Sequence, residues 1–305
     1  MRVAVTGGTG FVGRRVVARL TAAGHETVVI SRRAGHPIDV GPDALARAFE
    51  GCEAVVHCAG INREIGTQTY DRVHVAGTTA VIEAAQASGV RRVVMLSFLR
   101  ARLDGPTAYH RSKWAAEEVV RASGVTHTIL KAGVIHGRGD HMLDHLSHAF
   151  HTFPVFGLVG LRERPVRPVA VDDVARLLEA AALGDPRLAD RTFAVLGPET
   201  MTLGAAVHRV ARVTGRRLLY VRLPIAAHLL IAQVAEWTMR VPLVSIAQVH
   251  ILAEGIVEPL PFADPPPPDL APATRFSEDI IRAGLPEPGG FEVADLRCAP
   301  ERPRW

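Results

Sequence analysis

The sequence is poor in cysteine and has no recognisable leader segment. Its three cysteines are Cys52, Cys58 and Cys298, and they form no C-x-x-C pair. The first apolar run begins almost at Met1, so no signal peptide precedes it. We therefore expect a reduced, cytoplasmic protein.

Long uncharged apolar runs and long basic tracts are also missing. The most apolar late stretch, residues 218–244, is interrupted by charged or polar side chains, namely Arg222, His228, Glu236 and Arg240. It lacks the roughly 20 apolar residues of a membrane span, whereas a helix lying at a membrane interface stays open. The formal net charge is +4, but the arginines are scattered. We expect no membrane span and no nucleic-acid partner.

What the sequence does contain is a closely spaced set of glycines after an initial apolar run. Gly7, Gly10 and Gly13 form a G-x-x-G-x-x-G spacing, which allows a tight turn and the close approach of a pyrophosphate. Apolar residues at helical spacing follow, so free amides at a helix start would face the anion. The predicted binding segment comprises Gly7, Thr9, Gly10, Phe11, Val12 and Gly13.

Strand and helix patterns alternate through the first half of the chain. Further strands are predicted at residues 26–30, 54–57, 93–97, 126–130 and 191–196, with helices between them, including one long helix over 70–88. This alternation predicts right-handed crossovers and a doubly wound parallel sheet of the Rossmann kind. The fold class is α/β.

The second half of the chain is less regular. Residues 151–168 read as a loop rich in Phe, Pro and Gly, and helices dominate after residue 197. We expect a dinucleotide-binding domain at 1–197 and a smaller, mostly helical lobe at 198–305 that binds the substrate, with the loop 151–168 lining the cleft. The oligomeric state is expected to be monomer or homodimer.

The residues after the second strand bear on the choice of cofactor. A site for NAD usually has an acidic residue there to bind the ribose 2′-hydroxyl, whereas this chain has Ser31, Arg32 and Arg33. Guanidinium groups suit a 2′-phosphate. NADP is therefore the predicted cofactor, with NAD left open.

A tyrosine and a lysine four residues apart indicate proton-transfer chemistry. Tyr109 and Lys113 lie on one face of a predicted helix that follows a strand ending at Ser97. A neighbouring ammonium lowers the pKa of a phenol and lets it exchange a proton during hydride transfer. We predict Tyr109, Lys113 and Ser97 as catalytic residues.

Five segments together resemble the short-chain dehydrogenase/reductase superfamily in its extended or atypical branch, over roughly the first two-thirds of the chain. They are Thr6 to Gly13, Cys58 to Gly60, Gly77 and Thr78, Tyr109 to Lys113, and Val171 to Ala175. Residues 109–140 are most similar to the group related to an accessory NAD(P)H-binding subunit of respiratory complex I and to bacterial epimerase-like proteins. Because some members hold the cofactor structurally, the resemblance implies a cofactor more firmly than an activity.

The resemblance also implies roles for individual residues. Arg33 matches the 2′-phosphate position, Asp39 and Val40 the adenine contact, Ala59 and Gly60 the turn beside the adenosine ribose, Tyr109 the acid/base, and Lys113 its partner on the nicotinamide ribose. Three departures from the pattern affect the chemistry. Either Ser97 or Thr107 orients the substrate, or that partner is missing; His74 replaces the usual asparagine; and Lys131 with Ala132 replaces Arg-Pro.

Three functions remain open at this stage. The first is hydride transfer to or from a carbonyl or alcohol of an apolar substrate, such as a lipid or quinone. The second is a non-catalytic NADPH-binding accessory subunit or redox sensor, and the third is a nucleotide-sugar epimerase or dehydratase. The histidines of one predicted helix, His141, His145 and His148, lack a compact fourth ligand, so no metal site is predicted.

Overall fold

The computed structural model describes residues 1–32, 42–239, 242, 244–292 and 295–296. Contacts divide the chain into two compact units that are interleaved along the sequence. The first unit comprises Met1–Ile135, Val169–Pro198 and Glu258–Thr274, and the second comprises His136–Pro168, Glu199–Val257 and Arg275–Trp305. Each unit is described by itself below.

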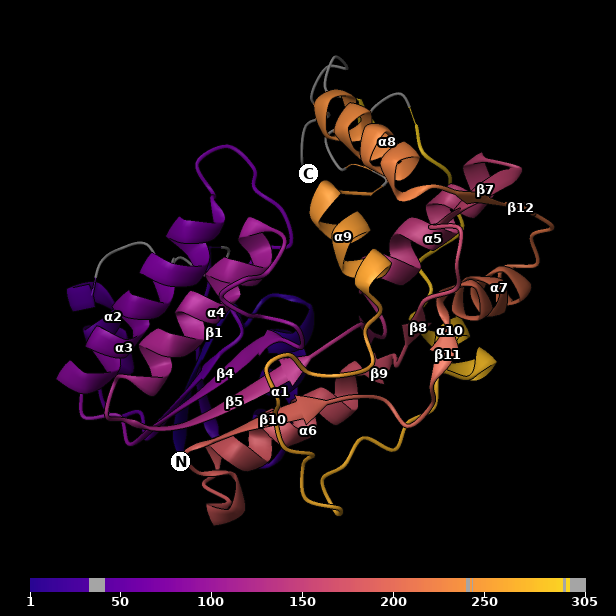
Figure 1. Ribbon diagram of the computed structural model, residues 1–305. Coiled ribbons are helices and arrows are strands. Elements are labelled where there is room, and N and C mark those ends of the chain that lie inside the picture. Colours follow the sequence, from indigo (N-terminus) through magenta and orange to yellow (C-terminus); the bar gives the residue numbers. More distant parts are fainter. Residues whose placement is uncertain (33–41, 240–241, 243, 293–294, 297–305) are drawn as a thin grey trace. The chain divides into compact units, whose positions relative to one another are not determined.

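The first unit is built around a six-stranded parallel sheet (Figure 1). Its strands are β1 (Arg2–Thr6), β2 (Glu26–Ile30), β3 (Ala54–His57), β4 (Arg92–Phe98), β5 (Thr126–Ala132) and β10 (Arg191–Val195). They lie in the order β10-β5-β4-β3-β1-β2. The predicted doubly wound α/β fold is confirmed.

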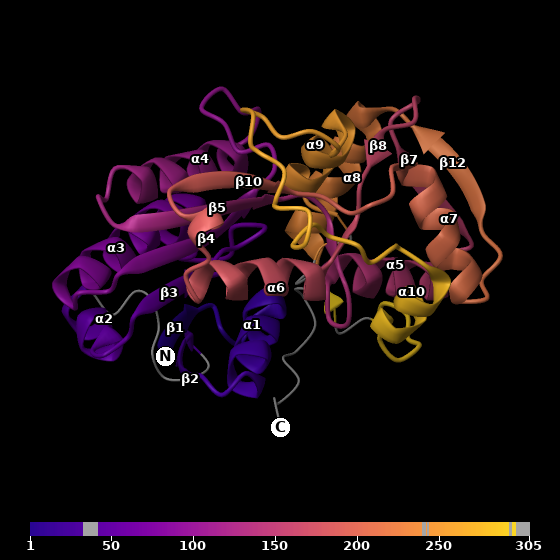
Figure 2. The ribbon, with the colours of Figure 1, turned by 90° about the horizontal axis from the view of Figure 1, so that it is seen from below.

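Helices cover both faces of this sheet (Figure 2). They are α1 (Phe11–Ala22), α2 (Pro42–Phe49), α3 (Gly77–Ala87), α4 (Ala108–Arg121) and α6 (Val171–Ala182), with a short turn η3 (Pro186–Leu188). Side chains of α1 and α6 pack on one face, and those of α2, α3 and α4 pack on the other.

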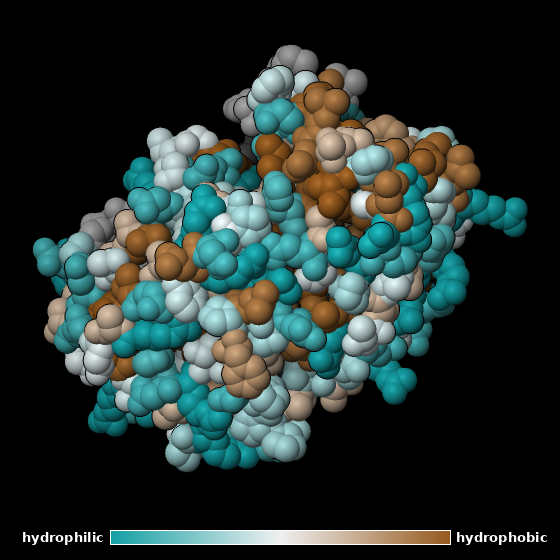
Figure 3. Space-filling view, viewed as in Figure 1, coloured by the Kyte–Doolittle hydropathy of each residue, from teal (hydrophilic) through white to brown (hydrophobic). Residues whose placement is uncertain are grey.

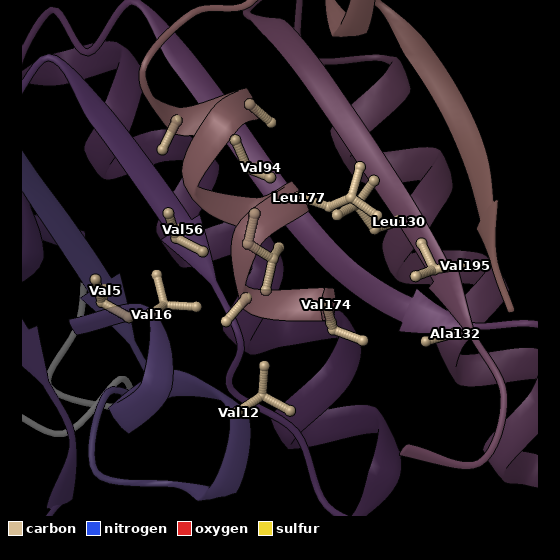
Figure 4. Close-up of a cluster of buried hydrophobic side chains, with 14 of the residues drawn as sticks. Val5, Val12, Val16, Val56, Val94, Leu130, Ala132, Val174, Leu177 and Val195 are labelled. Carbon is tan, nitrogen blue, oxygen red and sulfur yellow. The ribbon is translucent and has the colours of Figure 1, made fainter. Parts of the chain in front are cut away.

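Alternate residues along each strand supply the two cores. Val5 and Val56 join α1 and α6 in the cluster drawn in Figure 4, whereas Ala4 and Val55 face α2 and α3. Because both faces are covered, the central residues of most strands form short apolar runs rather than alternating with polar residues. This burial explains why the strand segments could be recognised as continuous apolar runs.

The helix expected over residues 70–88 begins differently from the prediction. Residues Asp71–Ala76 form a π-helical segment, η2, and the α-helix α3 begins only at Gly77. Wider π turns occur mostly as local insertions near functional sites. Here the wide turn carries His74, whose ring lies beside that of Tyr109.

The second unit is mostly helical, with two short two-stranded pairings. Its elements are α5 (His141–Thr152), β7 (Val155–Val159), β8 (Pro165–Val166), β11 (Met201–Thr202), α7 (Leu203–Val213), β12 (Leu219–Leu223), α8 (Ile225–Thr238), α9 (Ile246–Glu254) and α10 (Glu278–Gly284). Its core packs Phe150 of α5, Val210 of α7 and Ile281 of α10 together. Two strand segments, β6 (Ile135–His136) and β9 (Val169–Ala170), lie where the chain passes between the units.

The expectation of a structureless loop over residues 151–168 is wrong. β7 pairs in parallel with β12, and β8 pairs antiparallel with β11. Both partners come from more than thirty residues later in the chain, so local patterns could not reveal the pairings. Among the described residues, no helix has the length and apolar character needed to cross a lipid bilayer.

Candidate active site

The turn between β1 and α1 is so tight that its glycines have no room for side chains. Gly7 has a φ of +68°, and a Cβ atom there would lie 2.8 Å from the backbone nitrogen of Ala59. A Cβ on Gly13 would lie 2.2 Å from the carbonyl oxygen of Gly7. Gly10 caps α1 without a side-chain hydrogen bond, and the first helical turn has no acidic residue. The free amides of α1 therefore suit an anion such as a pyrophosphate.

This turn stands where the order of the strands reverses. β2 lies on one side of β1 and β3 on the other, and ligands of doubly wound sheets bind outside the carboxyl ends of such a pair. Thr9 and Phe11 are half-buried within the turn, and Val12 is buried. The turn after β3 carries Ala59 and Gly60 to the same end of the sheet. The structure thus brings the predicted glycine loop and the predicted ribose turn together.

Lys113 reaches the turn after β3 from α4. A Cβ on Gly60 would lie 3.0 Å from the Nζ atom of Lys113, so the ammonium lies directly against the backbone of this turn. The side chain is buried, and burial lowers the pKa of Lys113 to about 8, opposed by the negative charge of Glu117 and by Cys58. A titratable donor therefore faces the position expected for a ribose.

Tyr109 lies one helical turn before Lys113 in an aromatic cluster. Its ring centroid is 5.3 Å from that of Phe98, 5.6 Å from that of Tyr70 and 5.7 Å from that of His74. Burial, with a smaller contribution from Tyr70, raises the pKa of the phenol above its usual value of 10. The expected lowering of this pKa is therefore wrong for this structure, because burial determines the direction of the shift. A phenol held in its protonated form is suited to donate a proton.

His74 occupies the position where an asparagine was expected and links three segments. The Ile61 amide donates to its Nε2 at 3.1 Å, so its Nδ1–H donates to the Ser112 hydroxyl at 2.9 Å. That hydroxyl donates to the Tyr109 carbonyl at 3.1 Å. Burial, assisted by the charge of Lys113, lowers the pKa of His74 to about 2. A neutral imidazole therefore fixes the turn after β3 to the helix that carries Tyr109.

His57 forms a second buried chain of hydrogen bonds that the sequence analysis missed. Thr78 donates to the carbonyl of His74, so it accepts from His57 Nε2 at 2.9 Å, and Thr6 donates to His57 Nδ1 at 2.6 Å. Burial lowers the pKa of His57 to about 3, so the ring is neutral. This chain ties the end of β1 to the end of β3 and to α3. The only signal in the sequence was the placement of His57 at the end of a buried strand.

Ser97 does not face Tyr109 through a direct hydrogen bond among the described residues. Its hydroxyl donates to Glu117 Oε1 at 2.5 Å, and Glu117 also accepts from Lys131 at 3.2 Å and from Arg121 at 2.8 Å. Glu117 and Lys131 are both almost fully buried. The sequence did not reveal this ion pair because Glu117 lies on helix α4 and Lys131 on strand β5, and no local pattern links the two elements. A catalytic role for Ser97 stays a prediction.

Of the other predicted residues, two are placed by the structure and three lie outside the described residues. Arg32 is exposed just after β2, two residues beyond Ile30, whose carbonyl accepts the Gly7 amide at 2.8 Å. It therefore stands beside the glycine turn, as the 2′-phosphate prediction requires. Arg33, Asp39 and Val40 lie outside the part of the chain that the structure describes. The side chain of Thr107 contacts His110 Nδ1 at 2.7 Å.

A family of NAD(P)H-binding proteins matches residues 7–147 of the chain. The match covers every placed residue of the glycine turn, the turn after β3 and the Tyr109–Lys113 pair. Binding of an NAD(P)-type cofactor is therefore supported by both the geometry and the family.

Two curated proteins are similar to parts of the chain, one at higher identity over a shorter alignment and one at lower identity over a longer alignment. A protein named ceramide reductase from Caulobacter vibrioides is 36% identical over 151 residues, which cover 45% of this chain and 47% of that protein. The mouse mitochondrial protein NADH dehydrogenase [ubiquinone] 1 alpha subcomplex subunit 9 is 27% identical over 239 residues, which cover 72% of this chain and 63% of that protein. The chain thus spans less than two-thirds of the length of either relative.

Among solved structures, a nucleoside-diphosphate-sugar epimerase from Staphylococcus aureus has a similar fold. The TM-score is 0.69 at 13% identity, and the superposition covers 92% of this chain and all of that one. At this identity the likeness supports the fold alone.

Proposed function

We propose that the chain is a member of the extended branch of the short-chain dehydrogenase/reductase superfamily and that it reduces a carbonyl group with NADPH. The observation that carries the proposal is the meeting of three features at one end of the sheet. They are the glycine turn with the amides at the start of α1, the Lys113 ammonium beside Gly60, and the protonated Tyr109 phenol, which lies one helical turn before Lys113.

The chain's own residues have distinct roles in this reaction. The bound cofactor supplies the hydride. The glycine turn and the start of α1 hold its pyrophosphate, and Lys113 donates to the ribose hydroxyls. Tyr109 donates a proton to the oxygen of the substrate carbonyl. Because the pKa of Tyr109 is raised, the phenol carries its proton at neutral pH and has one to donate.

The Tyr109→Phe variant tests the proton-donor role. We expect carbonyl reduction to fall about 10²- to 10⁴-fold, as for loss of a general acid, while the affinity for NADPH changes little. The measurement is NADPH oxidation with a panel of long-chain ketones and quinones, together with calorimetric titration of the cofactor. Tyr220→Phe, in the second unit, is the matched control. Unchanged turnover in Tyr109→Phe would remove Tyr109 from the mechanism.

We assign the preference for NADPH over NADH to the arginines that follow β2. Arg32→Ala is expected to weaken NADPH binding about 10- to 100-fold and to change NADH binding little, because a charge-assisted hydrogen bond is lost only with the 2′-phosphate. Calorimetry with both cofactors measures the ratio. Arg91→Ala, which removes an exposed arginine just before β4, is the control. Equal losses for the two cofactors would contradict the assignment.

An apolar carbonyl compound is the proposed substrate class. The relative that is 36% identical is named for the reduction of a ceramide, a lipid. The helices α8 and α9 are rich in Leu, Ile, Val and Ala and carry one charged residue each. These residues offer little to bind a nucleotide diphosphate, so they favour a lipid over a nucleotide sugar.

A second candidate function is a structural NADPH-binding subunit without turnover. The observation that favours it is the alignment with the mouse NADH dehydrogenase subunit over 72% of this chain. This alternative predicts that the cofactor cannot be removed without unfolding the protein and that no carbonyl in the panel is reduced. Reversible binding with turnover excludes it.

A further inference from the structure

Helix α8 in the second unit places its small residues inward and its large apolar residues outward. Ala232 and Ala235 are buried, whereas Leu230 and Trp237 are 67% and 68% exposed. A helix on a protein surface ordinarily shows the reverse pattern, with its large apolar side chains in the core. The outer face of α8 therefore exposes large apolar side chains, as is typical of a surface that binds a partner or a membrane.

The apolar surface continues onto the strand before α8. We define the apolar patch as the exposed side chains Leu219, Val221, Leu230, Ile231, Val234 and Trp237. Figure 3 shows hydrophobic side chains gathered in the region of α8, β7 and β12. Contiguous apolar surface of this kind marks a site of interaction with a partner or a membrane.

Positive charge borders the apolar patch. Arg216 and Arg217 are exposed in the turn just before β12. The acidic residue of α8, Glu236, accepts a hydrogen bond at 2.9 Å from the amide of Ile246, the first residue of α9. The patch therefore combines large apolar side chains with a basic edge.

We propose that the apolar patch docks the protein on a membrane surface that contains anionic lipids. An interfacial helix inserts Leu, Ile and Trp side chains at the boundary of headgroups and acyl chains, and nearby arginines attract anionic headgroups. The exposed Arg216 and Arg217 are complementary in charge to anionic headgroups, whereas the apolar patch of a second copy offers them no anionic group. The proposal concerns binding alone and does not depend on the reductase function.

Vesicle flotation tests this proposal. The full-length protein is expected to float with vesicles of phosphatidylcholine and phosphatidylserine and to float less with phosphatidylcholine alone. The double variant Leu230→Glu/Val234→Glu is expected to lower the bound fraction at least about 10-fold, because charge replaces inserted apolar area. Arg216→Gln/Arg217→Gln is expected to remove the preference for phosphatidylserine while leaving the binding to neutral vesicles unchanged.

The matched control is Leu103→Glu, which puts the same charge at a leucine that is 74% exposed in the first unit. It is expected to float as the wild type does. Circular dichroism and urea unfolding establish that each variant folds. The proposal is overturned if the wild type does not float, if Leu230→Glu/Val234→Glu floats equally well, or if light scattering shows a wild-type dimer that this double variant converts to a monomer.

Discussion

Lys131→Met is expected to lower the free energy of unfolding by up to about 3 to 5 kcal/mol, the cost of removing one partner of a buried ion pair. In the folded chain the Lys131 ammonium donates to Glu117 Oε2 at 3.2 Å and to the carbonyl of Ala101 at 2.9 Å. Methionine fills a similar volume but removes the Lys131 charge, while Ser97 and Arg121 still donate to the buried Glu117 carboxylate. Urea unfolding followed by circular dichroism measures the loss.

The double variant Lys131→Met/Glu117→Gln is the control for this prediction. It removes both charges of the buried pair, so it is expected to recover part of the lost stability relative to Lys131→Met alone. A single variant as stable as the wild type would show that the ion pair contributes nothing to folding.

Lys113→Met, at the other lysine of the chain, is expected to change stability in the opposite direction. The pKa of Lys113 is about 8 in the folded chain and 10.5 when unperturbed. Between these pH values the unfolded chain binds more protons, so stability rises with pH, and below pH 8 the full cost of burying the ammonium is present. Removing that charge is therefore expected to raise the free energy of unfolding at pH 7 by up to about 3 kcal/mol.

The measurement is urea unfolding of the wild type and of Lys113→Met at pH 7 and at pH 10. The difference between the two proteins should shrink at the higher pH as the wild-type lysine loses its proton. Lower stability of Lys113→Met at pH 7 would show that the ammonium is well compensated in the fold. Such a gain in the free energy of unfolding would identify Lys113 as a residue that serves function although its burial destabilises the fold.

Gly13→Ala is expected to weaken NADPH binding at least about 100-fold, a loss near 3 kcal/mol. The added methyl group would meet the Gly7 carbonyl oxygen at 2.2 Å and the Gly8 Cα at 2.8 Å, so the backbone of the turn has to move. Such a shift misdirects the amides that hold the pyrophosphate. Calorimetric titration measures the affinity.

Gly289→Ala is the matched control for the glycine turn. A Cβ there would meet only His148 Nε2, at 4.0 Å, which is ordinary contact. This variant is expected to bind NADPH as the wild type does. Binding by Gly13→Ala equal to that of the wild type would place the cofactor elsewhere.

Much of the first unit could be predicted from the sequence because its signals are local. Buried parallel strands are continuous apolar runs, and Gly7 and Gly13 mark the turn between strand and helix. The spacing of Tyr109 and Lys113 alone placed both residues on one face of α4. The pairing of β7 with β12 could not be predicted, because residues 151–168 show no alternation and their partner strand lies more than sixty residues later.

The electrostatics of the site were harder to predict than its geometry. A tyrosine four residues before a lysine suggested a lowered phenol pKa, but the rings around Tyr109 desolvate it and raise the pKa instead. No sequence pattern linked Glu117 with Lys131, and only the fold shows that α4 and β5 bury them together. Burial depends on packing between distant segments, so a sequence pattern does not reveal it.

The most direct test of the central claim is calorimetric titration of the purified wild-type protein with NADPH and NADH after removal of any copurified nucleotide. The account predicts reversible binding of one cofactor molecule per chain, tighter for NADPH, with the preference lost in Arg32→Ala. Absence of binding by either cofactor would contradict the assignment of the glycine turn as a dinucleotide site.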